Sequence, residues 1–257
     1  MIDYPTFGGA PGNMRVEHPG LLLDRYASYS NQTFEKFDQG EDHKRLLQEV
    51  VETSKCGLSN DDQRMILSRW DFIMTLPHCE TFEASTIWRL ASHLARASTV
   101  ENASISLHPL YGFAYLPGEG LKGLALAWAK TLGTHNGAVD EADVLRIFGT
   151  PDAAGTVVFF DAWPITWPCL SVDIVNNHHR LYYDGLGDAG DWEAPNPTYF
   201  LTVPPTTCFR FAVALRDSLS TDLKDVNLAV AWLMGGLRDL GAGAKTAAGY
   251  GYFKVPQ

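Results

Sequence analysis

The sequence predicts an α+β protein, with helices in its first third and strands alternating with helices afterwards. In the first third, apolar residues recur at helical spacing within polar runs. From residue 81 onward, short segments rich in β-branched and aromatic residues alternate with helical stripes. The chain has 257 residues, of which 46% are hydrophobic. That is enough for a full core, and it excludes a disordered or fibrous protein.

The first third contains signals for two helices. Residues 34–55 are mostly polar but carry two pairs of aliphatic residues four positions apart, as in an amphipathic helix. A second helix is expected to begin after Ser59, because this hydroxyl and the Asp62 carboxylate can satisfy free N–H groups. It is expected to continue to about Leu76. We therefore assign residues 1–79 to a mainly helical region packed on the core.

The elements expected after this region follow one order. They are a strand at 81–90, a short strand at 105–107, a helix opened by the loop 117–120 and running to about 132, a helix at 140–148, strands at 155–161 and 170–175 that pair with each other, a long loop at 184–198, a strand at 207–215, a helix at 226–240 and a strand at 250–255. Without the additions, the order is strand, helix, strand, strand, helix, strand, which is the ferredoxin-like βαββαβ unit shared by RNA-binding RRM domains. This predicts an RRM-like domain over residues 80–257, with an insertion around 162–206.

Charge is unevenly distributed along the chain. Thirty acidic and twenty basic residues give a formal net charge of −10, which at face value speaks against nucleic acid, because phosphate binding draws on lysine and arginine. Residues 1–83 and 138–200 together hold 24 acidic and 10 basic residues, whereas 84–137 and 235–257 are each positive by two charges. The two positive segments are also the most glycine-rich, so the total charge does not exclude an anionic ligand there.

The chain ends and the cysteines indicate a cytoplasmic protein without a metal or a cofactor. The N-terminal sequence lacks the basic stretch and apolar core of a secretory signal. No apolar run approaches the roughly 18 residues of a membrane span, so we expect no membrane contact. The four cysteines are scattered, without the close pairs or the histidine spacing of a zinc site. We therefore expect free thiols in a reducing cytoplasm.

The strongest motif is a glycine-rich stretch at residues 235–251, between the last expected helix and the last expected strand. Glycine has no side chain, so backbone N–H groups in such a loop approach a ligand closely. They form an anion-binding concavity, to which Lys245 adds a charge. Residue 244 is alanine where a P-loop has glycine before Lys-Thr, which argues against nucleotide hydrolysis. The alternative is a turn that only returns the strand to its sheet.

A second glycine-rich stretch at residues 108–123 contains Pro-Gly-Glu-Gly at 117–120, before a predicted helix. The free N–H groups and the dipole at a helix start favour a phosphate. Lys122 lies in the first turn, against the usual dipole preference, which indicates a nearby anion. Two glycine and lysine stretches in one chain favour an anionic ligand over two ordinary turns.

Several motifs, taken in order, resemble those of the RAMP proteins of type III CRISPR systems. They are Tyr115-Leu116-Pro117-Gly118-x-x-Leu121-Lys122-Gly123, Asp161-Ala162-x-Pro164, Asp173-Ile174 with His179 and Tyr182-Tyr183, Pro204 with Phe209, and Gly241-x-Gly243-x-Lys245-Thr246-x-x-Gly249-Tyr250-Gly251. Within that superfamily the resemblance is to the sixth-subunit family of the Cmr (type III-B) effector. It covers roughly residues 80–257 and depends on the whole set of motifs.

This resemblance implies a non-catalytic, RNA-binding structural subunit of a type III-B ribonucleoprotein, active in antiviral defence. Such a subunit holds the backbone of the CRISPR RNA (crRNA) toward its 3′ end for target-RNA recognition. The implied partners are the crRNA, the target RNA, an adjacent backbone RAMP subunit, a small helical subunit and a RAMP subunit that caps the 3′ end. The implied RNA-binding residues are Gly118, Gly120, Lys122, Gly241, Gly243, Lys245, Thr246, Gly249 and Tyr250. The chain departs from the family pattern at Glu119 and Gly120, where serines are usual, and at Leu126, where arginine is often found.

Two other functions stay open. Some RAMP relatives process CRISPR RNA as metal-independent endoribonucleases, and His178 and His179 have the chemistry of a general base and a general acid for such cleavage. In a non-catalytic subunit, the same histidines and Tyr183 are candidates for an RNA or subunit contact. The third function is a protein–protein adaptor, in which the loops are turns and the acidic helices dock neighbours. We assign no catalytic residue.

Overall fold

The structure, a computed structural model, describes residues 16–24, 41–55, 58–92, 105–133, 139–177, 185, 187–188, 196–217 and 223–256. The chain divides into two compact units. The larger, here called the sheet unit, comprises Leu58–His93, Ser106–Cys169 and Val203–Gln257. The smaller, here called the hairpin unit, comprises Met1–Gly57, Leu94–Ile105 and Leu170–Thr202. The predicted domain boundary at residue 80 and the predicted insertion at 162–206 stay predictions.

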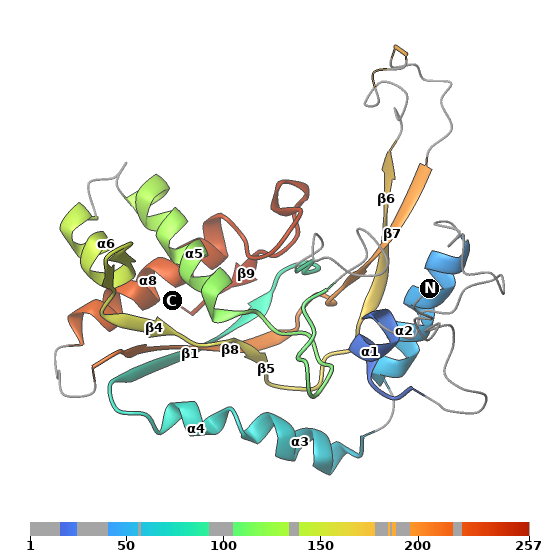
Figure 1. Ribbon diagram of the computed structural model, residues 1–257, viewed down its shortest axis with the longest axis horizontal. Helices are drawn as coiled ribbons and strands as arrows, with labels where there is room; N and C mark the ends of the chain where they lie inside the picture. Colours follow the sequence, from blue (N-terminus) through green and yellow to red (C-terminus); the bar gives the residue numbers. More distant parts are fainter. Residues whose placement is uncertain are drawn as a thin grey trace, which may run out of the picture. The chain divides into compact units, whose positions relative to one another are not determined.

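The sheet unit is built on an antiparallel sheet of five strands (Figure 1). They are β1 (Cys79–Thr86), β4 (Val157–Phe159), β5 (Trp163–Pro164), β8 (Cys208–Leu215) and β9 (Phe253–Lys254). The order is β4-β8-β1-β9, and β5 also pairs with β8. Phe82 lies opposite Phe211 in the central pair, and their rings stack with centroids 4.9 Å apart. The antiparallel sheet and the surrounding helices confirm the α+β class.

Two helices pack together on one face of this sheet, α5 (Gly118–Trp128) and α8 (Lys224–Asp239) (Figure 1). Their close approach depends on glycine, since a Cβ built on Gly235 would lie 2.4 Å from the Trp128 ring. The predicted stripe of α8 is confirmed at Val226, Leu233 and Leu237, which are fully buried. A short π-helical segment, η1 (Ala129–Gly133), follows α5.

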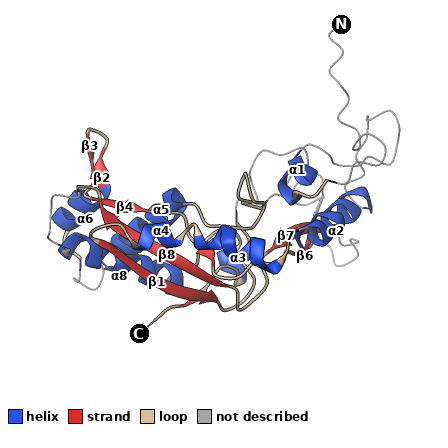
Figure 2. Cartoon of the chain, turned by 90° about the horizontal axis from the view of Figure 1, so that it is seen from below, coloured by secondary structure: helices blue, strands red, loops and turns tan. Residues whose placement is uncertain are grey.

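Helix α6 (Glu141–Phe148) forms as predicted, with Asp140 capping its start and Gly149 ending it at a φ of 85°. It leads into a small hairpin of β2 (Gly149–Thr150) and β3 (Ala153–Ala154), which Figure 2 shows beside α6. The chain then enters β4.

The opposite face of the sheet carries two short helices, α3 (Asn60–Ser68) and α4 (Asp71–Met74) (Figure 1). Ser59 caps α3 as predicted, accepting from the amide of Asp62 at 3.1 Å. The expected single helix to residue 76 is wrong, because it is interrupted at Arg69 and Trp70. At this point the backbone bonds tighten to three-residue turns, with the amide of Trp70 donating to the Leu67 carbonyl at 3.2 Å. The Trp70 indole N–H donates to the Asp161 carbonyl at 2.9 Å.

The hairpin unit contains helices α1 (Pro19–Asp24) and α2 (Glu41–Lys55) and strands β6 (Ser171–Asn177) and β7 (Asn196–Thr202). The predicted pairing of 170–175 with 155–161 is wrong, because β6 pairs with β7 over seven consecutive positions. Helix α2 packs on both strands. Its buried apolar residues include Leu46, Leu47 and Val50, three of the aliphatic residues that predicted an amphipathic helix. The expected loop at 184–198 gives way to strand at Asn196.

The predicted strands at 105–107 and 250–255 are much reduced in the structure. Residues 105–107 contribute only an isolated bridge, Leu107 to Ala114. The last strand contains two residues, because the glycines before it hold the chain in positive φ. None of the helices described by the structure is long and apolar enough to cross a membrane.

Candidate functional site

The predicted ligand loop lies between α8 and β9 (Figure 1). Several of its residues adopt a positive φ, namely Gly241, Gly243, Lys245, Gly249 and Gly251. At two of them a side chain does not fit. A Cβ on Gly243 would lie 2.3 Å from the Ala91 carbonyl oxygen, and one on Gly251 would lie 1.9 Å from that of Ala242. The loop conformation therefore requires glycine at these two positions.

Backbone hydrogen bonds fasten the loop to the segment that follows β1. The amide of Ala244 donates to the Ala91 carbonyl at 2.6 Å, and the amide of Gly251 donates to the Arg89 carbonyl at 2.9 Å. In return, the amide of Ile87 donates to the Tyr252 carbonyl at 2.8 Å. The loop and residues 87–91 therefore form one surface, here called the loop surface and taken as residues 85–92 with 241–256.

Part of the loop keeps backbone donors available. Thr246–Ala248 form a single 3₁₀ turn, η2, and Lys245 precedes it in the left-handed conformation. In the part of the chain that the structure describes, no protein oxygen accepts from the amides of Gly243, Thr246 or Ala247. Gly243 and Ala247 are exposed. Unused amides next to a lysine are the donors from which anion-binding concavities are built.

The loop surface is cationic within an acidic chain. It contains Arg89, Lys245 and Lys254 and no aspartate or glutamate, although the chain as a whole has a net charge of −10. Lys254 is exposed and lies opposite Ser85 in the pairing of β9 with β1. A local excess of three positive charges favours an anionic ligand at this surface.

The second predicted site differs from its expectation. Gly118 and Gly120 do not form a loop before a helix, because α5 begins at Gly118. The amide of Gly118 donates to the Asp161 carboxylate at 2.7 Å, so the protein's own anion caps this helix start. A Cβ on Gly118 would lie 2.3 Å from the Phe159 carbonyl oxygen, whereas one on Gly120 would meet nothing within 4 Å. Gly118 therefore serves the close packing of α5 on β4.

The predicted residues fall into groups on different elements. Six of them share the loop, namely Gly241, Gly243, Lys245, Thr246, Gly249 and Tyr250. Three occupy the first turns of α5, namely Gly118, Gly120 and Lys122. His178, His179 and Tyr183 lie outside the described residues.

Sequence reasoning missed the segment after β1 as part of the site. Residues 87–90 were expected inside a longer strand at 81–90, but β1 ends at Thr86. Ile87 and Trp88 are exposed and Arg89 is half-buried beside the loop. The available signal was a tryptophan followed by an arginine at the end of the predicted strand.

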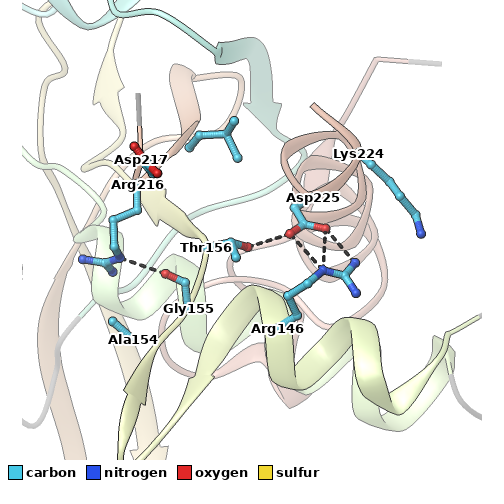
Figure 3. Close-up of a pocket in the computed structure, with 9 residues that line it drawn as sticks. Arg146, Ala154, Gly155, Thr156, Arg216, Asp217, Lys224 and Asp225 are labelled. Carbon is cyan, nitrogen blue, oxygen red and sulfur yellow. Dashed lines mark hydrogen bonds and ion pairs between the residues drawn. The ribbon is translucent and has the colours of Figure 1, made fainter. Parts of the chain in front are cut away.

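A cavity of about 530 Å³ lies at another part of the sheet unit, between α6, the segment that leads from β3 into β4, the end of β8 and the start of α8 (Figure 3). Charged side chains that line the cavity form ion pairs and hydrogen bonds with one another. The Arg146 guanidinium binds Asp225 with Nη2 2.7 Å from Oδ1, and the Thr156 hydroxyl donates to the same carboxylate at 2.8 Å. The hydrogen bond from Arg146 lowers the pKa of the Asp225 carboxyl and raises the pKa of the guanidinium. This network ties α6 and β4 to α8.

The described residues contain no cluster of three histidine, cysteine, aspartate or glutamate side chains able to hold a metal ion.

Comparisons with known proteins assign the chain to a family. The family model of the RAMP superfamily matches residues 4–254. A Pyrococcus furiosus protein named "CRISPR system Cmr subunit Cmr6" is 43% identical over 118 residues, covering 42% of this chain and 33% of its own length. A Saccharolobus solfataricus protein named "CRISPR system CMR subunit Cmr6" is 28% identical over 158 residues, covering 60% of this chain and 49% of its own. The aligned parts thus span a third to a half of these relatives.

A solved structure shares the fold. It is a chain in the "Cryo-EM structure of the Type III-B Cmr-beta bound to cognate target RNA", with a TM-score of 0.61 and 19% identity, covering 93% of this chain and 85% of that one. At this identity the likeness concerns the fold alone. The match of the family model over nearly the whole chain is decisive: the chain belongs to the RAMP superfamily.

Proposed function

We propose that the chain is a subunit of a type III-B CRISPR effector complex and that it binds RNA without cleaving it. Membership of the RAMP superfamily supports the first part, together with relatives named as Cmr subunits. A fold shared with a chain of a Cmr complex bound to target RNA also supports the first part.

The observation that carries the RNA-binding role is the loop surface. It combines three positive charges, no acidic residue and backbone amides for which the described part of the chain offers no acceptor. Amides and basic side chains bind phosphates without reading the base sequence. A strand held in this way needs few basic residues from one subunit, which reconciles an RNA ligand with an acidic chain.

We assign the principal phosphate contact to Lys245, supported by the backbone amides of Gly243 and Thr246 and by Tyr250. Gly241 and Gly249, whose amides donate to the carbonyls of Gly236 and Thr246, contribute the shape of the loop. Gly118, Gly120 and Lys122 form a second, weaker contact. The Asp161 carboxylate already occupies the first amide of that helix, and a carboxylate repels phosphate. This ranking makes Lys245 the more sensitive position.

We also propose that the sheet unit holds the ferredoxin-like βαββαβ core. In support, β1, α5, β4, β8, α8 and β9 follow in that order, and the sheet order is β4-β8-β1-β9. Residues 1–79 and an insertion around 162–206 are additions to this core. The proposed partners are the crRNA toward its 3′ end, the target RNA, an adjacent backbone RAMP subunit, a small helical subunit and a 3′-end capping RAMP subunit.

Co-expression with the neighbouring genes tests this function. We expect the tagged chain to copurify with other subunits and with a discrete RNA set that shares a repeat-derived 5′ tag. Sequencing of that RNA is the measurement, and heterogeneous RNA or none contradicts the proposal. Incubation of the purified chain with repeat RNA is expected to yield no cleavage. Cleavage that is lost in His178→Ala or His179→Ala shows an endoribonuclease instead.

A further inference from the structure

The loop surface carries an exposed apolar pair, Ile87 and Trp88, where β1 ends. Their exposed fractions are 60% and 53%. The pair is fixed in place, because the Ile87 amide is bonded to the Tyr252 carbonyl and the next residue, Arg89, accepts from Gly251. An aromatic ring held in water on a fixed backbone gives up the favourable burial available to it.

The neighbouring residues show that the exposure belongs to this pair. Leu90 and Ala91, which follow directly, are fully buried, as are Phe82 and Ala84 earlier in β1. The segment thus packs its other apolar side chains and leaves the largest one at the surface. Packing of the sheet unit therefore does not explain why the Trp88 side chain is exposed.

The surroundings of the pair favour a nucleic acid as its ligand over a protein. Arg89, Lys245 and Lys254 belong to the same loop surface, and no acidic residue does. A polyanion whose units also carry flat rings matches a cationic surface with an exposed indole. Such a combination of charge and aromatic side chains is typical of proteins that bind single strands.

The geometry points to Trp88 as a stacking platform for an unpaired nucleobase of the RNA strand that the loop holds. This inference rests on the proposed RNA-binding function and adds the class of ligand: a single strand with at least one accessible base face. Inside a duplex both faces of a base are covered by its neighbours, so a duplex cannot use the indole. Stacking on an indole also tolerates any base, because every base has a π-face.

Binding of a labelled 12-nucleotide single-stranded RNA to the full chain, measured at several salt concentrations, tests the inference. Trp88→Leu is expected to weaken binding about tenfold at every salt concentration, within the range measured for loss of one stacked base. The slope of log K against log salt is expected to stay unchanged, because no charge is removed. Trp88→Phe is expected to weaken binding less than Trp88→Leu does. The same RNA sequence annealed as a duplex is expected to bind the wild-type chain more weakly than the single strand does.

Phe72→Leu is the matched control. Phe72 is 70% exposed on α4, which lies on the face of the sheet opposite α5 and α8 (Figure 1). This substitution is expected to leave RNA binding unchanged. A second measurement uses RNA that contains 5-iodouridine, crosslinked by light within the copurified complex. We expect the peptide that carries Trp88 among the crosslinked products.

The outcomes separate this inference from the function on which it rests. If Lys245→Asn lowers the salt slope while Trp88→Leu binds like wild type, the stacking role is wrong and RNA binding stands. If neither the full chain nor its complex binds RNA, the proposed function itself is wrong. If Trp88→Leu loses partner subunits at unchanged RNA affinity, the pair docks a protein, which also overturns the inference.

Discussion

The Asp161 carboxylate accepts a hydrogen bond of 2.7 Å from the backbone amide of Gly118, the first residue of α5. Pro117 precedes this helix and offers no side-chain cap, so the cap comes from a residue 43 positions later. The backbone carbonyl of the same aspartate accepts from the Trp70 indole. One residue thus connects α5 with the segment between α3 and α4.

Replacement of Asp161 tests this cap. Asp161→Ala is expected to lower the free energy of unfolding by about 1 kcal/mol, because the first amide of α5 loses its acceptor and the helix dipole loses a favourable charge. Asp161→Asn keeps an oxygen acceptor and is expected to lower the free energy of unfolding less than Asp161→Ala does. Urea unfolding followed by circular dichroism measures both. Asp152→Ala, in the exposed turn of the β2–β3 hairpin, is the control, and an equal loss there contradicts the cap.

The glycines of the loop make a second, graded prediction. Gly251→Ala is expected to destabilise the protein by at least about 2 kcal/mol, because the new Cβ meets the Ala242 oxygen and the residue keeps a positive φ. Gly249→Ala has the same sign of φ but open space around the Cβ, so about 1 kcal/mol is expected. Gly120→Ala, within α5, is expected to be neutral or to stabilise by up to about 1 kcal/mol. Thermal unfolding ranks the three, and any other order is evidence against the described loop conformation.

The elements that the sequence predicted correctly depend on local signals. Ser59 with Asp62 begins α3, Asp140 begins α6 and Gly149 ends it. The stripe of α8 follows from residue spacing alone. In each case the deciding contacts lie within a few residues along the chain, where spacing and capping chemistry can be read directly.

The predictions that failed depend on contacts between distant residues. Strand β6 pairs with β7 instead of β4, and periodicity carries no information about the partner of a strand. The break after Ser68 coincides with a contact of Trp70 with residue 161. In the candidate site, the glycine pattern located the loop, but the segment of Trp88 and Arg89 is joined to it by backbone bonds to residues more than 150 positions away. Such a juxtaposition has no local signature.

Lys245 allows a charge to be removed without disturbing the loop. Its φ of 58° is left-handed, a conformation that asparagine tolerates better than most residues. Lys245→Asn is therefore expected to keep the loop conformation, while it weakens RNA binding. The slope of log K against log salt is expected to fall by about 0.7 to 1, which corresponds to one phosphate contact.

The control for Lys245→Asn is Lys55→Ala, which removes a lysine that pairs with Glu52 on the surface of α2. It is expected to leave the affinity and the slope unchanged. Equal effects of the two substitutions show that only the overall charge of the chain matters, and they contradict a specific contact at the loop.

The Arg146–Asp225 pair predicts how stability depends on pH. The hydrogen bond from Arg146 lowers the pKa of the Asp225 carboxyl in the folded state below its unfolded value of about 3.9. As the pH falls, the unfolded chain therefore binds this proton first. The stabilisation is complete at neutral pH, declines as the pH falls through about 4, and is lost below the folded-state pKa.

Asp225→Asn tests this dependence. It is expected to cost about 1 kcal/mol at pH 7, because the Arg146 side chain is 40% exposed and solvent weakens the pair. The difference between the variant and the wild type is expected to shrink as the pH falls from 5 toward 3, where protonation removes the same charge from the wild type. Urea unfolding at pH 7, 5 and 3 measures it. Asp61→Asn removes a carboxylate from a pair in which both side chains are largely exposed, so its difference is expected to be near zero at every pH. A difference for Asp225→Asn that stays constant with pH shows that the charge of this carboxylate does not stabilise the junction of α6 with α8.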